Sequence, residues 1–522
     1  MTMGGLFVAL HPYPESLRWR WTFGRFFATM PCPRFLPIRD VSLRHHVTFI
    51  FAFVFLAGLG LSAARVSAQP AVEALQKRLD DAMPGTTIEL PAAVLNLKQP
   101  LRLSRSGTET APITLRAKDR GKTVISGKAG IELIGAGHVI IEGLSFTHES
   151  RTPAIRLVDC QNVRITRCSF RLDGTGIQRQ NWIHISGSKS GQNRIDHNLF
   201  EDLATAGAYI AIDGSEAAPF QISKSDRIDY NHFRAIARRT GGGARAVRLG
   251  WTKLADSTSQ TVMEFNLFEQ CSGDEEIVTV RASGAAIRFN TFMNSAGYLC
   301  LRLGKENQAE GNFFFSENRD GVGGIRVHGE QAKVFNNYFE GLTVPAVVLS
   351  NGSSGGGTIE APRPAAKGAN IVFNTWVNCG GGALEIGSTG GGILLDAPTD
   401  CVIANNVAIG YGDELIRMRS KPEIKWAGNI MFHAGAKEKV GLDVPEAQIN
   451  VTFPKLRNQG GIWRLGPNSP AIDAADGEYE FVATDVDGQP RPKKKDAGSD
   501  EFATGPIKQR PFTAIDVGVE AP

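Results

Sequence analysis

The chain has 522 residues, of which 42% are hydrophobic and 21% charged, so it can bury a large core. This length exceeds one compact globular domain unless the chain winds into a solenoid. The formal charge of +4 arises in residues 1–68, which hold seven arginines; the remainder carries 50 basic and 51 acidic side chains and gives no indication of a nucleic-acid partner.

A secretory leader is predicted over residues 1–68. Basic residues Arg44–His46 precede a 15-residue apolar run, Val47–Leu61, and the small-x-small sequence Val66–Ala68. This order is typical of a signal peptide cleaved after Ala68. The apolar run is short for a membrane span, which needs about 20 residues, although an uncleaved anchor is the alternative. We therefore expect a secreted or periplasmic protein with no membrane attachment after signal removal.

A short amphipathic helix is predicted over residues 71–83, and Pro84-Gly85 ends it. Its apolar face comprises Val72, Leu75, Leu79 and Ala82. Strand-like runs then alternate with turns. Since the first rung of a solenoid must be covered, we interpret the helix as an N-terminal cap.

A repeat of about two dozen residues organises the middle of the chain. The tripeptide Asn-x-Phe, or a near relative, returns at intervals of 24, 22 and 25 residues, at Asn266, Asn290, Asn312 and Asn337. This period, with β-branched runs between recurrences, predicts an all-β parallel β-helix. The asparagines are predicted to form a ladder and the aromatic rings a stack behind it.

Longer intervals mark inserted loops, at Leu172–Trp182, Gly214–Asp226 and Arg238–Ala244. Loops inserted on successive rungs usually line one side of a solenoid, where binding clefts form. The parallel β-helix domain is assigned to residues 69–457. Residues 458–522 lose the period and are predicted to be a C-terminal cap along the last rungs.

Six cysteines remain after leader removal, with no Cys-x-x-Cys pair or metal-type cluster among them. We interpret them as buried thiols inside the solenoid, with disulfide pairing as the alternative in an exported protein. They are Cys160, Cys168, Cys271, Cys300, Cys379 and Cys401.

The densest group of ionisable residues lies within the Asn-x-Phe repeats. Arg281 and Arg302 are 21 residues apart and Arg326 lies 24 further on, so one rung separates each from the next. Such a basic ladder suits an acidic sugar chain, because planar guanidinium groups bind carboxylates with two hydrogen bonds. The alternative is a set of solvated arginines beside a charged turn, Asp274–Glu276.

The chain resembles polysaccharide lyase family six, whose members include alginate lyases and chondroitinase B. The similarity covers most of the chain after the leader and is strongest over Asn266–Leu342. The segments that carry it are Ser106–Thr108, Ala111–Ala117, Val139–Phe146, Asn193–Phe200, Gly323–Val327 and Asn336–Phe339. The resemblance implies a right-handed parallel β-helix and β-elimination of a uronate-containing polysaccharide.

The resemblance also implies site residues. In this family a lysine removes the C5 proton, an arginine assists at the leaving group, and acidic residues often hold Ca²⁺ against the uronate carboxylate. The assisting arginine corresponds to Arg302, and the calcium ligands to Asp274 and Glu276. The base position carries Arg281, and Leu303 stands where the family has histidine. No asparagine that would complete the calcium set is evident near residues 242–244.

Because a guanidinium has a pKa above 12, Arg281 is expected mainly to neutralise the substrate carboxylate. Lys305 and His328 are then the candidate substitute bases or substrate contacts, and Arg326 and His184 further sugar contacts; a surface role is the alternative for Lys305 and His328. The predicted function is a lyase acting on alginate, of the poly(β-D-mannuronate) type, with an acidic polysaccharide as partner. The alternative is a non-catalytic carbohydrate-binding β-helix that kept its cleft.

Overall fold

The computed structural model describes residues 68–239, 241–353, 363–388, 394–503 and 505–522. The chain divides into two units, Met1–Ala64 and Arg65–Pro522, and the description below concerns the second. The predicted leader lies outside the described residues, apart from its last residue. Within the described ranges, no helix has both the length and the apolar character needed to cross a membrane.

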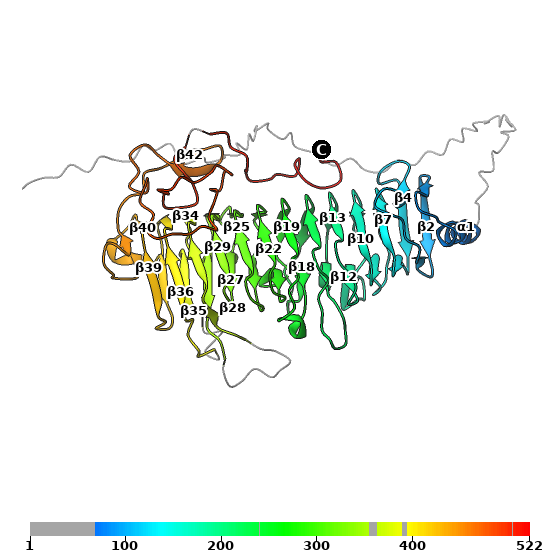
Figure 1. Ribbon diagram of the computed structural model, residues 1–522, viewed down its shortest axis with the longest axis horizontal. Helices are drawn as coiled ribbons and strands as arrows, with labels where there is room; N and C mark the ends of the chain where they lie inside the picture. Colours follow the sequence, from blue (N-terminus) through cyan, green and yellow to red (C-terminus); the bar gives the residue numbers. More distant parts are fainter. Residues whose placement is uncertain (1–67, 240, 354–362, 389–393, 504) are drawn as a thin grey trace, which may run out of the picture. The chain divides into compact units, whose positions relative to one another are not determined.

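Residues 87–450 form a right-handed parallel β-helix, as predicted (Figure 1). Each turn of the chain up to β38 contributes one strand to each of three sheets, which we call sheets 1, 2 and 3, and neighbouring strands in each sheet pair in parallel. Sheet 1 comprises β1 (Thr87–Leu90), β4 (Ile113–Ala117), β7 (Gly137–Glu142), β10 (Gln161–Thr166), β13 (Arg194–Asp196), β16 (Arg227–Asp229), β19 (Val262–Glu264), β22 (Ala286–Arg288), β25 (Gln308–Glu310), β29 (Lys333–Phe335), β33 (Asn370–Val372), β36 (Cys401–Ala404) and β39 (Ile424–Ala427).

Sheets 2 and 3 complete the coil. Sheet 2 comprises β2 (Ala93–Leu97), β5 (Thr123–Gly127), β8 (Ser145–Phe146), β11 (Ser169–Phe170), β14 (Leu199–Glu201), β17 (His232–Ile236), β20 (Leu267–Cys271), β23 (Thr291–Met293), β26 (Phe313–Phe315), β30 (Tyr338–Glu340), β34 (Thr375–Val377), β37 (Val407–Gly410), β40 (Asn429–His433) and β41 (Ile449–Asn450). Sheet 3 comprises β3 (Leu101–Leu103), β6 (Ile131–Ile134), β9 (Ile155–Val158), β12 (Arg179–Ser186), β15 (Ala206–Ile212), β18 (Ala244–Leu249), β21 (Glu276–Val280), β24 (Gly297–Leu301), β27 (Val322–Val327), β31 (Val347–Ser350), β35 (Leu384–Ser388) and β38 (Ile416–Met418).

The turn between sheets 1 and 2 explains the repeated asparagines. The residue before each one has a positive φ, for example 57° at Phe265 and 54° at Phe289, and this left-handed residue redirects the chain sharply. The following asparagine is buried, and its side-chain oxygen accepts a hydrogen bond from the backbone of the preceding rung: Asn290 Oδ1 accepts from Asn266 N at 3.0 Å. The predicted ladder is confirmed at Asn198, Asn231, Asn266, Asn290, Asn312, Asn337, Asn374, Asn406 and Asn429.

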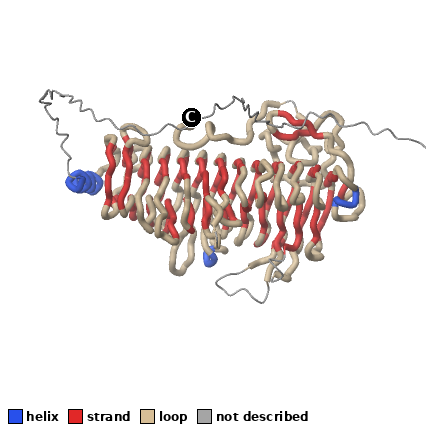
Figure 2. Tube along the Cα trace, turned by 180° about the vertical axis from the view of Figure 1, so that it is seen from behind, coloured by secondary structure: helices blue, strands red, loops and turns tan. Residues whose placement is uncertain are grey.

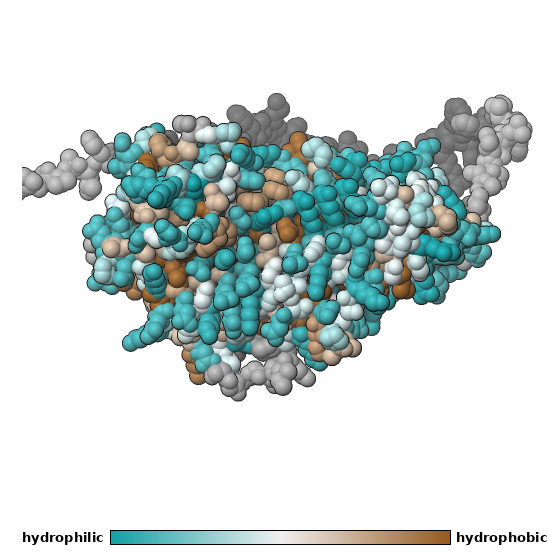
Figure 3. Space-filling model, viewed as in Figure 1, coloured by the Kyte–Doolittle hydropathy of each residue, from teal (hydrophilic) through white to brown (hydrophobic). Residues whose placement is uncertain are grey.

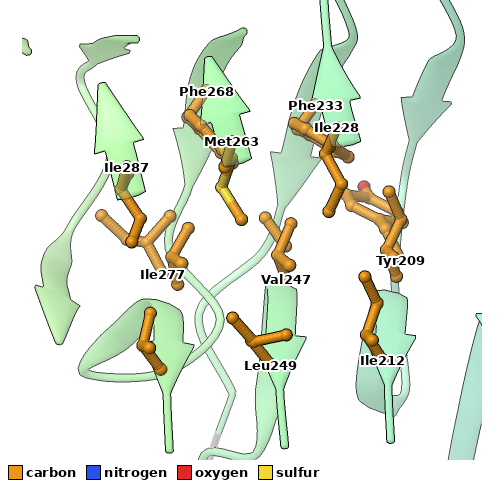
Figure 4. Packing of buried hydrophobic residues seen from close by; sticks show 14 of the residues in the cluster. Tyr209, Ile212, Ile228, Phe233, Val247, Leu249, Met263, Phe268, Ile277 and Ile287 are labelled. Carbon is orange, nitrogen blue, oxygen red and sulfur yellow. The ribbon is translucent and has the colours of Figure 1, made fainter. Parts of the chain in front are cut away.

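The interior is filled by side chains that alternate inward along each strand (Figure 4). The predicted aromatic stack is confirmed, since the rings of Phe268, Phe292 and Phe314 lie parallel with centroids 4.5 Å apart. Stacked phenylalanines of this kind contribute roughly 0.5–1.5 kcal/mol per pair beyond their buried area. The six cysteines are free, buried thiols, as predicted, and burial raises the pKa of Cys168 to about 12.

The first rung is covered by α1 (Ala68–Asp80), which begins and ends three residues earlier than the predicted range of 71–83. Leu75 and Leu79 are buried in the hydrophobic core. The Gln76 amide donates to the Arg102 carbonyl and accepts from the Arg102 N–H, both at 2.9 Å. The helix therefore satisfies backbone groups of β3 that have no further strand to pair with.

Residues beyond β41 leave the coil and pack along its outside. An antiparallel pair, β42 (Leu456–Gln459) and β43 (Ile462–Leu465), lies beside the late rungs, as Figures 1 and 2 show. The final segment then returns along earlier rungs, further than the predicted cap over the last rungs. Phe512 stacks on Phe265 at 5.7 Å, and the Arg167 guanidinium donates to the Ala521 carbonyl at 2.7 Å.

Candidate active site

A row of ionisable residues lies where consecutive strands of sheet 3 end. Arg281, Arg302 and His328 directly follow β21, β24 and β27. Each is held by the rung before it: Arg281 N donates to Leu249 O at 2.8 Å, and Arg302 N donates to Val280 O at 2.8 Å. Parallel pairing therefore places the three residues one strand apart, as the spacing of Arg281 and Arg302 predicts. The predicted third member of the ladder is wrong, because Arg326 pairs with Cys300 and lies two residues before His328, which takes that place.

The carboxylate of Glu276, at the start of β21, is the centre of the group. Arg245 Nη2 on β18 lies 3.1 Å from Oε2, Arg302 Nε lies 3.7 Å from Oε1, and Arg281 Nη2 lies 4.0 Å from Oε2. Burial alone would raise the pKa of Glu276, but these three guanidinium groups lower it below its usual value. Glu276 is therefore ionised, and one negative charge is shared by three arginines.

Arg281 forms fewer side-chain hydrogen bonds than Arg245 or Arg302. Its Nε is buried and has no hydrogen-bond partner among the described residues. Burial lowers the pKa of its guanidinium, and Arg245, Arg302 and Arg248 lower it further, whereas Glu276 raises it. A largely buried cation with one unpartnered donor, beside other cations, is suited to an incoming carboxylate.

Arg302 is oriented from two sides. Besides its contact with Glu276, its Nη1 lies 3.5 Å from Nε2 of His328, whose Nδ1 lies 3.3 Å from the Pro364 carbonyl oxygen. Burial first, and then the charges of Arg302 and Arg326, lower the pKa of His328 to about 3. The imidazole is therefore neutral at ordinary pH. With Nδ1 donating to the carbonyl, Nε2 is left as an acceptor toward Arg302.

A cavity of about 530 Å³ opens at the other edge of sheet 3, where the chain enters the strands. Its lining includes Arg326 and Tyr298 together with Asp274 and Glu275. The Arg326 guanidinium lies over the Tyr298 ring, 4.3 Å from its centroid, and its Nη1 lies 3.2 Å from Glu275 Oε2. Of the three predicted inserted loops, one contributes to this lining, through Arg238 and Arg239.

The structure does not bring Lys305 or His184 to Glu276. Lys305 is half-exposed and pairs with Glu330 at 3.7 Å, in the turn after the Arg302 strand. His184 lies on β12, three strands from β21, which is about 14 Å at the usual strand spacing. Its Nε2 lies 3.0 Å from Asp213 Oδ2. One cluster therefore contains five of the candidates predicted from sequence, and Arg326 lies beside it. The five are Arg281, Arg302, His328, Asp274 and Glu276.

The two predicted calcium ligands, Asp274 and Glu276, share one guanidinium group. Arg245 Nη2 lies between them, 2.7 Å from Asp274 Oδ2 and 3.1 Å from Glu276 Oε2. Asp274 Oδ2 also accepts from Gly243 N at 2.9 Å, and Oδ1 accepts from Glu275 N at 2.7 Å. Calcium needs six to eight oxygen ligands at about 2.3–2.6 Å, and here the carboxylate oxygens already face N–H donors. These residues do not fit a calcium ion.

Sequence reasoning missed Arg245, and it missed Asp213 and Arg248, which lie beside the predicted His184. Arg248 Nη2 lies 2.8 Å from Asp213 Oδ2, which also binds His184. Strand register was the signal that could have found Arg245. Val247 pairs with Val278, so the residues two positions earlier, Arg245 and Glu276, face the same way on neighbouring strands.

Comparison with protein families gives one match. A sequence model of the chondroitinase B family matches residues 70–410. A search of curated proteins found no match.

Several solved structures share the fold. A variant of the family-six alginate lyase AlyGC has a TM-score of 0.68 at 23% identity, covering 86% of this chain and 58% of that one. A mannuronic-acid-specific family-six lyase from the human gut microbiota has a TM-score of 0.62 at 23% identity, over 73% and 89% of the two chains. Pedsa3628, a family-six polysaccharide lyase from Pseudopedobacter saltans, has a TM-score of 0.63 at 18% identity, over 86% and 98%. The chain thus spans little more than half of the AlyGC polypeptide, and at these identities the similarity shows the fold.

Proposed function

Since this chain belongs to the chondroitinase B family, within polysaccharide lyase family six, we propose that it cleaves a uronate-containing polysaccharide by β-elimination. Alginate is the proposed polymer, with mannuronate as the uronate. The observation that carries the proposal is the convergence of Arg245, Arg281 and Arg302 within 4.0 Å of the Glu276 carboxylate. Three cations around one anion leave excess positive charge where an acidic sugar would bind.

The reaction makes two demands on the site. The C5 proton beside the uronate carboxylate must be removed while negative charge develops on that carboxylate, and the C4 oxygen must leave with a proton. In our proposal the guanidinium of Arg281 binds the carboxylate, since its Nε has no hydrogen-bond partner among the described residues and its side chain is mostly buried. Arg302, held by Glu276 and His328, faces the leaving oxygen. Loss of the proton and of the C4–O bond then leaves a C4–C5 double bond on the new non-reducing end.

Two groups of the cluster could accept the C5 proton. Arg281 in its neutral form is a strong base, but depressing its pKa by about 5 units costs roughly 7 kcal/mol at 1.36 kcal/mol per unit. His328 is already neutral, but its Nε2 is buried behind Arg302 and is a weak base. Tyr298 does not qualify, because burial raises its pKa to about 12. Lys305, paired with Glu330 outside the cluster, contributes neither binding nor proton transfer in this proposal.

Turnover of defined polymers tests the proposal. Purified protein is incubated with alginate, polymannuronate, polyguluronate and dermatan sulfate, and the unsaturated product is followed by ultraviolet absorbance and mass spectrometry. We expect product from at least one uronate polymer and none from the Arg302→Ala variant. Saturable binding of a polymer without any unsaturated product would instead support the alternative, a carbohydrate-binding β-helix. The specific observation behind that alternative is the guanidinium at position 281.

A further inference from the structure

The guanidinium of Arg245 occupies a position that joins two carboxylates on neighbouring loops and strands. Its Nη2 is within 3.1 Å of both Asp274 and Glu276, and its Nε donates to Glu276 Oε2 at 3.1 Å. All three side chains are largely buried, with 16%, 17% and 10% of their surfaces exposed. A contact of this kind is much less screened by water than a surface ion pair.

Arg245 and Arg281 together bring the same positive charge to the Asp274 and Glu276 pair as a divalent cation would. A divalent cation between Asp274 and Glu276 would bring two positive charges to the pair. Arg245 brings one charge at that position and Arg281, which also faces Glu276, brings the second. With Arg302, the five groups carry a net charge of about +1 when all are ionised, which one uronate carboxylate would neutralise.

We propose that Arg245 replaces a divalent cation at this site, so that the protein binds and turns over its polymer without a metal ion. The part about turnover rests on the proposed function, whereas the part about metal binding does not. Arg245 also holds the Glu276 carboxylate in place, and Glu276 in turn contacts Arg281 and Arg302. In this respect Arg245 is a positioning residue for the two guanidinium groups that face the substrate.

A guanidinium differs from a metal ion in ways that can be measured. It is covalently attached, it is not removed by chelators, and its charge does not depend on the free cation concentration. Its planar donors also impose a geometry on the two carboxylates that a spherical ion does not. Replacing it by a neutral amide would leave two acidic side chains and an oxygen ligand facing one another, which is a donor set suited to Ca²⁺.

Calorimetric titration with CaCl₂ and thermal unfolding with CaCl₂ or EDTA test the proposal without any substrate. We expect wild-type protein to give no saturable heat, and no shift in its thermal midpoint, that the Glu276→Gln variant lacks. The Arg245→Asn variant should bind Ca²⁺ and gain at least about 2 °C in the presence of excess CaCl₂. Arg248→Asn is the matched control, since it removes an arginine from the same strand that pairs with Asp213 instead. It should gain no Ca²⁺ binding.

Adding Glu276→Gln to the Arg245→Asn variant should abolish the acquired binding. Ca²⁺ binding by wild-type protein that Glu276→Gln removes would overturn the proposal, and so would a folded Arg245→Asn variant that binds no Ca²⁺. If Arg245→Asn does not fold, the wild-type titration still decides the question. These outcomes are independent of turnover, so failure to cleave any polymer would refute the proposed function alone. If the protein is active, EDTA should leave its rate within about twofold, because no bound ion is being removed.

Discussion

Arg302 Nη1 lies 3.5 Å from Nε2 of His328, and this neutral imidazole sits between the guanidinium and the Pro364 carbonyl. The contact holds Nη1 of Arg302 in place, while Nε of the same guanidinium faces Glu276. His328→Ala should therefore lower kcat by about tenfold, equivalent to about 1.4 kcal/mol of transition-state stabilisation, with little change in KM. His328→Gln, whose amide oxygen can accept the same hydrogen bond, should recover part of the loss. Equal losses in both variants would contradict a positioning role.

The buried His328 imidazole should also make the stability of the protein depend on pH. Its pKa is about 3 in the folded protein and about 6.5 when unfolded, so the unfolded chain binds more protons between these values. The stability contributed by the neutral imidazole is fully present above pH 6.5 and is lost as the pH falls toward 3. His328→Gln should lose less stability than wild type over this range, measured by urea unfolding at successive pH values. Identical pH slopes would count against the buried neutral state.

Arg281→Lys distinguishes the two possible proton acceptors. If Arg281 only neutralises the substrate carboxylate, the lysine variant keeps the charge, and turnover should be preserved or raised. Lys305→Ala, outside the cluster, should retain wild-type activity and serves as the control. A rising limb of the kcat–pH profile that moves to lower pH in Arg281→Lys, with the profile of Lys305→Ala unchanged, would instead show that Arg281 is itself the base, because an amine loses its proton more readily than a guanidinium. The measurement is kcat as a function of pH on the best polymer substrate.

Arg326 is expected to act in binding, since it lines the cavity and stacks on Tyr298. Arg326→Ala should raise KM by about tenfold, corresponding to about 1.4 kcal/mol, and change kcat little, because the interaction is made equally in the ground and transition states. The conservative variant Arg326→Lys should fall between the two, as lysine cannot form two parallel hydrogen bonds. A fall in kcat at constant KM would place Arg326 in the chemical step instead.

The asparagine ladder should be a main source of stability. Asn312→Ala removes a buried side chain that accepts from Asn290 N at 3.1 Å and donates to Asn337 Oδ1 at 3.0 Å. Leaving such groups without partners costs about 1–3 kcal/mol each. We expect a loss of at least about 2 kcal/mol in the free energy of unfolding, measured by urea titration. Exposed Asn458 on β42 offers a control, and Asn458→Ala should change stability by less than about 0.5 kcal/mol.

The fold could be predicted from sequence because three successive turns of the coil have similar lengths of 24, 22 and 25 residues. Asparagines recur at the same turn on each rung from Asn198 to Asn429, so their spacing reports the architecture directly. The same regularity put Arg281 and Arg302 side by side, since only 21 residues separate them. Rungs with inserted loops hide this relationship. Arg245 and Glu276 are 31 positions apart because a long connection, residues 250–261, follows β18, and only the strand register reveals that the two residues meet.

Lys305 shows a second limit of sequence reasoning. It is three residues from Arg302, but it lies beyond the strand and pairs with Glu330 in the following turn. Proximity along the chain therefore did not bring its amine to the cluster. Arg245, 57 residues before Arg302, shares a carboxylate with it. Strand register, rather than distance in sequence, determines which side chains meet in the site.

The returning C-terminal segment has a consequence for how the protein reaches its native state. Coils of a solenoid contact mainly their neighbours, so most rungs could form as soon as the next one is available. The contact between Arg167 and Ala521, however, joins residues 354 positions apart, and Phe512 packs on Tyr230 and Phe265. Contacts of such high sequence separation slow folding, because the intervening chain must be ordered first. The early rungs thus acquire their last contacts only when the final residues of the chain have been synthesised.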